Sequence, residues 1–144
     1  MVRLKPDTAG ASPCSVVSGL AGLSADCCCD SAAAAAGKTA EARAFLQQLD
    51  GVRRAEFDAS ERRIGIAKEL WYLAKLPSGD HLIAYMESGD FGGALQGFVG
   101  SRDSFDMWFK AQMQSVTGVD LNNPPADLAP AELLSHYDVR SMPV

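Results

Sequence analysis

The apolar residues of this chain change their spacing twice between residues 37 and 121, which constrains the fold more than any other feature. A helical repeat after Thr39 comprises Ala42, Phe45, Leu46 and Leu49. Two runs with the composition of strands follow, at residues 68–76 and 81–87, joined by the hairpin-like sequence Pro77-Ser-Gly-Asp80. A helical repeat then returns up to Gly118. The order helix–strand–strand–helix predicts an α+β domain built on an antiparallel sheet.

Capping residues and glycines set the expected ends of the first two helices. Thr39 is expected to cap the first helix, and Asp50-Gly51 to end or kink it. Asp58 is a candidate cap for a second helical piece, with Glu61 in the capping-box position and Gly65 at its end. Arginines alternate with Glu56 and Glu61 here, which is typical of an exposed, salt-bridged face.

The helical region after the hairpin is expected in two parts. Asp90 begins the first part, and Gly100-Ser101 interrupts it. Asp103 or Ser104 then caps a stronger helix that Gly118 closes. The apolar residues of this stronger helix are Phe105, Trp108, Phe109, Met113 and Val116.

Alternation sorts the hairpin residues into two faces that are both largely apolar. One face of the first strand holds Leu70, Tyr72 and Ala74, and the other holds Trp71, Leu73 and Lys75. On the second strand, His81, Ile83 and Tyr85 alternate with Leu82, Ala84 and Met86. A sheet with one solvated face would show clean polar alternation, so we expect both faces to be covered.

The two ends of the chain differ from this centre. Residues 1–36 are a low-complexity segment without aromatic residues, expected to be disordered because they bury too little apolar area. They are either a genuine tail or insertion, or the product of a misplaced start or a shifted reading frame. Cys14 and the run 27–29 lack zinc-ligand spacing and are interpreted as free thiols. Residues 122–144 are expected to form a linker with a short helix or an edge strand.

Composition excludes several classes of function. The net charge is −5 over 144 residues, with 47% hydrophobic and 22% charged residues, as in ordinary globular proteins. Lys and Arg gather on no face, so neither nucleic acid nor an anionic membrane is an expected partner. No apolar run has the length needed to span a bilayer, and the segment 14–23 is a weak match to a signal peptide. We therefore predict a cytoplasmic protein.

The stretch 39–121 resembles an uncharacterised bacterial family of the dimeric α/β-barrel group. The resemblance rests on these segments: Ala42-Arg-Ala-Phe45, Glu69-Leu-Trp-Tyr72, Pro77-Ser-Gly-Asp80, Ser104-Phe-Asp-Met-Trp-Phe109 and Gly118-Val-Asp-Leu121. It implies a ferredoxin-like antiparallel sheet at 37–121, with helices on one face and a second copy on the other, hence a homodimer. Such a unit needs a strand before the first helix, and the candidates are Met1–Leu4 and Ser15–Leu20.

Candidate site residues come from the hairpin. His81 and Tyr85 are the candidate catalytic residues, because an imidazole beside aromatic side chains suits proton abstraction from a small apolar substrate. The candidate ligand-binding residues are Trp71, Leu73 and Ile83. Strand alternation could bring Trp71 onto one face with His81 and Tyr85. The competing interpretation is that the aromatic residues only pack and that His81 is a solvent-exposed turn residue.

Further candidate groups are weaker. Glu69 and Glu87 are possible paired carboxylates, but two solvated strand ends explain them more simply. His136 near the carboxyl terminus is a possible base. The sequence supports no metal site and no cofactor. Three functions remain open: binding of a small apolar ligand in a dimer cavity, catalysis by a cofactor-independent monooxygenase or isomerase, and a purely structural dimer.

Overall fold

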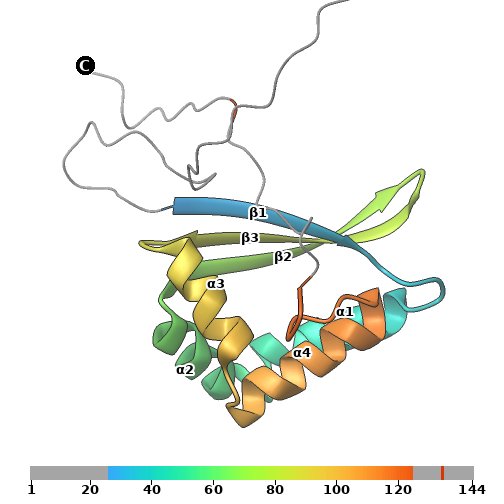
Figure 1. Cartoon of the computed structure of the whole chain (residues 1–144). Helices are drawn as coiled ribbons and strands as arrows, with labels where there is room; N and C mark the ends of the chain where they lie inside the picture. Colours follow the sequence, from blue (N-terminus) through green and yellow to red (C-terminus); the bar gives the residue numbers. More distant parts are fainter. Residues whose placement is uncertain (1–25, 125–133, 135–144) are drawn as a thin grey trace, which may run out of the picture.

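A computed structural model describes residues 26–124 and residue 134 of the chain (Figure 1). These residues form an α+β domain with a three-stranded open sheet and four helices. The elements in chain order are β1 (Asp26–Ala33), α1 (Thr39–Asp50), α2 (Arg54–Ile64), β2 (Ile66–Leu76), β3 (Gly79–Ser88), α3 (Phe91–Gly100) and α4 (Ser104–Thr117). The predicted fold class is confirmed at this level.

The sheet has the strand order β1-β3-β2, with both pairs antiparallel. The hairpin of β2 and β3 is confirmed, and its register pairs Trp71 with Ala84 and Leu73 with Leu82. The strand before α1 is Asp26–Ala33, which lies inside the segment predicted to be disordered. This strand was not expected. The two strand candidates Met1–Leu4 and Ser15–Leu20 lie outside the described residues, as do residues 125–133 and 135–144.

All four helices pack on one face of the sheet (Figure 1). The core between sheet and helices contains α1, α4 and β3 residues. Its fully buried members are Ala42, Phe45, Leu49, Leu82, Phe105, Phe109, Met113 and Val116. Phe109 lies at its centre, because its ring contacts those of Phe45, Trp71 and Phe98 at centroid distances of 5.2, 6.0 and 5.8 Å. The helical repeats predicted for α1 and α4 are therefore confirmed.

Most expected helix ends are confirmed, and two are wrong. Thr39 does not cap the first helix, because Lys38 occupies the cap position and the Thr39 hydroxyl donates to Oδ2 of Asp80. The Asp90 side chain accepts from the amide of Gly93, and Asp103 accepts from the amide of Phe105. Gly65 and Gly118 end their helices in the left-handed region, at φ 88° and 81°, where a side chain would be strained. The second helix, however, begins at Arg54 rather than after Asp58. Asp58 instead forms an ion pair with Arg62 one turn later.

The face of the sheet opposite the helices carries large apolar side chains. Tyr72 is 54% exposed and Leu70 is 38% exposed, and Ile83 and Tyr85 lie beside them on β3. No described helix covers this face, so the expectation that both faces are covered is confirmed for the helix side and stays a prediction for this one. We call Leu70, Tyr72, Leu76, Ile83 and Tyr85 the open-face cluster. Among residues 26–124, no helix combines the length and apolar content that crossing a membrane requires.

Candidate functional site

A cavity of about 120 Å³ lies between the sheet and helices α2, α3 and α4. Five aromatic side chains line it: Trp71, Phe91, Phe98, Phe105 and Phe109. Aliphatic and Met side chains supply most of the remaining wall. Among the described lining residues, the titratable side chains are those of Glu61 and Glu69. The cavity is thus an apolar chamber with two carboxyl groups in its wall.

The two carboxyl groups reach the cavity from different elements. Phe57, Ser60, Glu61 and Ile64 follow helical spacing on α2, so Glu61 shares the inward face of that helix. Glu69 precedes Trp71 by two residues on β2, so both side chains lie on the helix side of the sheet. The indole Nε1–H of Trp71 donates a hydrogen bond to Oε1 of Glu69. This bond fixes the orientation of the Glu69 carboxylate within the chamber wall.

Glu61 and Glu69 form a carboxyl pair in which Glu61 is the more readily protonated member. Burial raises the pKa of Glu61 to about 9, and the charge of Glu69, the hydrogen bond to Glu69 and the charge of Asp106 act in the same direction. Burial also raises the pKa of Glu69, although hydrogen bonds from Trp71 and Glu61 oppose this shift. Two carboxylates have only acceptors, so a proton on Glu61 is what allows the pair to hydrogen-bond.

This pair has more hydrogen-bond acceptors than donors. Oε2 of Glu61 is buried and accepts no hydrogen bond from the described residues. No Lys, Arg or His is among the described side chains that line the cavity. The neighbouring Arg63 is engaged elsewhere, 2.6 Å from Oδ2 of Asp106. A buried polar atom without a partner costs free energy, so the chamber is chemically incomplete without a donor.

The residues predicted from the sequence to form a site are divided between the two faces of the sheet. Trp71 lines the cavity, and Leu73 packs against the core on the same face. His81, Ile83 and Tyr85 lie on the open face, because their β3 neighbours Leu82 and Ala84 are the residues paired with Leu73 and Trp71. The prediction that Trp71 shares a face with His81 and Tyr85 is therefore wrong. His136 lies outside the described residues.

On the open face, the predicted catalytic residues have local polar partners. The Tyr85 hydroxyl donates to Oε1 of Glu87 over 2.8 Å, and Lys68 lies 3.4 Å from the same carboxylate oxygen. Nε2 of His81 is 3.2 Å from the hydroxyl of Ser78 in the hairpin turn. Glu87 thus pairs with Lys68 and Tyr85, whereas Glu69 pairs with Glu61. The tentative pairing of Glu69 with Glu87 is wrong, because the two carboxyls lie on opposite faces of the sheet.

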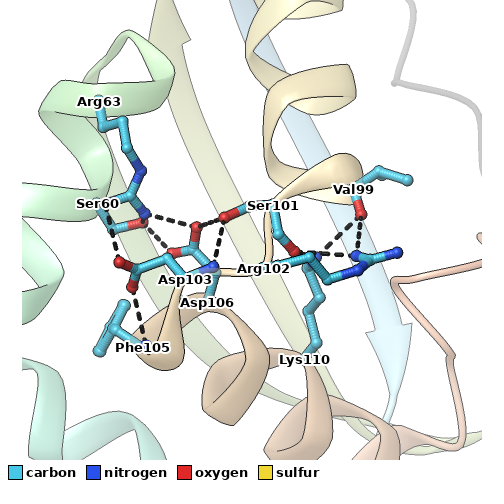
Figure 2. A network of polar contacts seen from close by, with 9 residues as sticks. All are labelled: Ser60, Arg63, Val99, Ser101, Arg102, Asp103, Phe105, Asp106 and Lys110. Atoms are coloured by element: carbon cyan, nitrogen blue, oxygen red, sulfur yellow. Dashed lines mark hydrogen bonds and ion pairs between the residues drawn. The ribbon is translucent and has the colours of Figure 1, made fainter.

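A second polar cluster lies at the junction of α2, α3 and α4 (Figure 2). The carboxylate of Asp106, fully buried, accepts hydrogen bonds from Ser60, Ser101 and Arg63. The ammonium of Lys110, whose residue is 1% exposed, donates to the carbonyls of Val99 and Ser101 over 3.0 Å each. We call this set of contacts the Asp106 network. Its carboxylate is fully partnered, so the network stabilises the helix junction and leaves no group free for a ligand.

No group of three or more His, Cys, Asp or Glu side chains is placed to hold a metal ion in the part of the chain that the structure describes. The chamber with Glu61 and Glu69 is therefore the candidate site, since it combines space, apolar walls and an unsatisfied polar group. Comparison with known proteins gives no match to a family model, to a curated protein or to a solved structure.

Proposed function

We propose that this protein binds a small, largely apolar molecule in the chamber between the sheet and the helices. The observation that carries the proposal is an apolar cavity lined by Glu61, whose buried Oε2 receives no hydrogen bond from the described residues. An apolar ligand surface is favoured against the aromatic walls. A polar group on the ligand would supply the missing hydrogen bond.

The volume limits the ligand to a few heavy atoms. A cavity of about 150 Å³ with Leu, Ile and Phe walls holds one benzene molecule. The chamber of this protein, at about 120 Å³, suits a five-membered ring or a branched chain of similar size. For so few atoms we expect a dissociation constant on the order of 1 mM, equivalent to about 4 kcal/mol.

Titration with cyclopentanol tests this proposal. We expect the indole N–H resonance of Trp71 to shift in a ¹H–¹⁵N spectrum, because this group lines the chamber and bonds to Glu69. The chain has two tryptophans, so the Trp108→Phe variant assigns the signal. In Ala94→Leu the larger side chain enters the chamber from α3, and binding should disappear. An unchanged Trp71 signal up to the solubility limit of cyclopentanol would contradict the proposal.

The carboxyl pair of Glu61 and Glu69 favours a second candidate function, that of an isomerase acting on a small carbonyl compound. Glu69 would take a proton from the carbon next to the carbonyl, and Glu61 would give its proton to the carbonyl oxygen. The product of this step is the enol, and no cofactor is needed. His81 and Tyr85, the expected catalytic residues of an isomerase or monooxygenase, lie on the opposite face and are outside this chamber.

Deuterium uptake by cyclopentanone in D₂O tests the isomerase candidate. We expect the wild-type protein to accelerate exchange next to the carbonyl by about 10²-fold or more over buffer, the usual range for a positioned acid–base group. Glu69→Gln should lose this acceleration, while Glu87→Gln on the open face should keep it. Equal rates for wild type and Glu69→Gln would exclude this candidate and leave the binding function intact.

We also propose that the open-face cluster pairs with the same surface of a second copy, which would give the ferredoxin-like dimeric barrel that the sequence resemblance implies. The cluster supports this proposal because Tyr72, Leu70 and Leu76 are 54%, 38% and 47% exposed on a sheet face that none of the described helices covers. Adjacent exposed apolar side chains of this size are typical of protein interfaces.

Light scattering coupled to size-exclusion chromatography tests the dimer. We expect the wild-type chain at twice its monomer mass of 15.3 kDa, and Tyr72→Glu at the monomer mass. In Tyr72→Glu the buried interface would hold an unpaired charge, which should raise the dissociation constant of the dimer at least tenfold. Val52→Glu is the matched control, because Val52 is 87% exposed in the α1–α2 connection, away from the sheet. A monomeric wild type would contradict the dimer.

A further inference from the structure

We infer that the ligand of the chamber is a monocation: a small apolar amine whose ammonium group lies between Glu61 and Glu69. The inference rests on the proposed binding function and specifies the chemistry that the site selects. It follows from the number of donors and acceptors, the charge and the aromatic content of the chamber wall.

The supply of hydrogen-bond donors in the wall is too small for its acceptors. The two carboxyl groups present four oxygen atoms, whereas the donor that they receive from a described lining side chain is the Trp71 indole N–H. Oε2 of Glu61 is buried without a donor from the described residues. A ligand with acceptors alone, such as an ether, would leave this deficit in place. An ammonium group brings three donors and no acceptor, so it meets the deficit directly.

The charge of the lining residues also favours an ammonium ligand. When Glu69 is ionised, no cationic side chain among the described lining residues is there to pair with its charge. Arg62, Arg63 and Lys68, the nearest cations in the sequence, pair with Asp58, Asp106 and Glu87 instead. A buried charge is stable when an opposite charge pairs with it, and a monocationic ligand would provide that pairing.

The aromatic walls also favour a cation. Trp71, Phe98 and Phe105 line the chamber together with the two carboxyls. The negative faces of aromatic rings attract ammonium groups, and indole does so most strongly. An uncharged alcohol of the same shape gains no cation–π attraction and donates one hydrogen bond where the ammonium group can donate three.

Three ligands of matched shape test the inference: cyclopentylamine, cyclopentanol and cyclopentane, each titrated at pH 7 and followed by the Trp71 indole resonance. We expect the amine to bind wild-type protein at least tenfold more tightly than the alcohol. In the double variant Glu61→Gln/Glu69→Gln, which keeps the shape of the wall but removes its charge, we expect the preference to fall below threefold while cyclopentane still binds.

The possible outcomes separate the two proposals. If cyclopentane and cyclopentanol bind but the amine binds no more tightly, the amine inference is overturned and the binding function stands. If none of the three ligands binds, both proposals fail. If the amine preference persists in the double variant, the amine occupies another acidic surface and the inference is overturned. The wild-type comparison needs no variant, so it decides the question even if the double variant does not fold.

Discussion

We expect Asp106→Ala to lower the free energy of unfolding by about 3 kcal/mol, because it removes the buried acceptor of three hydrogen bonds. The hydroxyl of Ser60, in a residue that is 1% exposed, would lose its acceptor in the helix junction. Arg63 is 43% exposed and can turn to solvent, which limits the loss. Urea denaturation of wild type and variant measures this difference.

The control is Asp58→Ala, which removes an exposed i, i+4 ion pair with Arg62. Such pairs contribute about 0.5 kcal/mol or less, so this variant should unfold close to wild type. If Asp106→Ala also stayed within about 1 kcal/mol of wild type, a central role of the network in joining α2, α3 and α4 would be wrong.

The pH dependence of the same measurement gives a further check on Asp106. Burial acts to raise the pKa of its carboxyl, but hydrogen bonds from Ser101, Ser60 and Arg63 outweigh burial and hold the pKa below 3.8. A lowered pKa means that the folded state favours the ionised group, so the stabilisation is complete above pH 3.8. It is lost as the pH falls through the lowered pKa. The difference between wild type and Asp106→Ala should therefore shrink in strong acid.

The sequence predicted the elements whose periodicity is local and strong. The α4 repeat from Phe105 to Val116 has an apolar residue on the buried face of each helical turn. The β2–β3 hairpin has strands rich in aromatic residues, joined by a short connection. By contrast, β1 contains three cysteines and two aspartates and lacks the β-branched or aromatic residues that favour strands. It is a strand because it pairs with β3 along its whole length, a long-range effect that no local pattern contains.

The candidate site was missed because polar residues at inward positions were interpreted as solvent-exposed. The signal was present in the helical spacing: Glu61 lies between Phe57 and Ile64 on one face of α2. In the same way, Asp106 and Lys110 lie one turn apart on the inward face of α4. Helical spacing could have identified all three positions as buried. It could not have identified their partners, which come from other elements.

The division of the predicted site between two faces has a different cause. Alternation shows which strand residues lie on the same side of their own strand, but only the register shows how two strands combine. Here Trp71 pairs with Ala84, so its side chain lies on the opposite face of the sheet from that of Tyr85. A bulge between Ile66 and Lys68 further breaks the alternation at the start of β2. The register and the bulge depend on tertiary packing, so the sequence pattern alone could not predict them.

The second large effect concerns pH and the Glu61–Glu69 pair. Between about pH 5 and pH 8 we expect the free energy of unfolding of the wild-type protein to fall, by about 4 kcal/mol in total, as the pH rises. The folded pKa of Glu61 is raised to about 9 from 4.5, so the folded state holds a proton that the unfolded chain releases. This contribution to stability is complete below pH 4.5 and is lost as the pH rises toward 9.

Glu61→Gln should remove most of this slope. The amide keeps a donor for the Glu69 carboxylate and needs no proton, so the slope that remains comes from Glu69, whose pKa burial also raises. The variant should therefore be more stable than wild type at pH 8, although it alters the candidate site. Stability and ligand binding would then place opposite demands on Glu61, a trade-off that is common at functional sites.

Urea denaturation at pH 5, 6, 7 and 8 measures both slopes, and Glu56→Gln is the matched control. Glu56 also lies on α2, but it is exposed and pairs with Arg53, so its removal should leave the wild-type slope unchanged. Parallel curves for wild type and Glu61→Gln would show that Glu61 is ionised at neutral pH in the folded protein. The carboxyl pair would then carry two negative charges, and both the isomerase candidate and the assignment of a proton to Glu61 would be wrong.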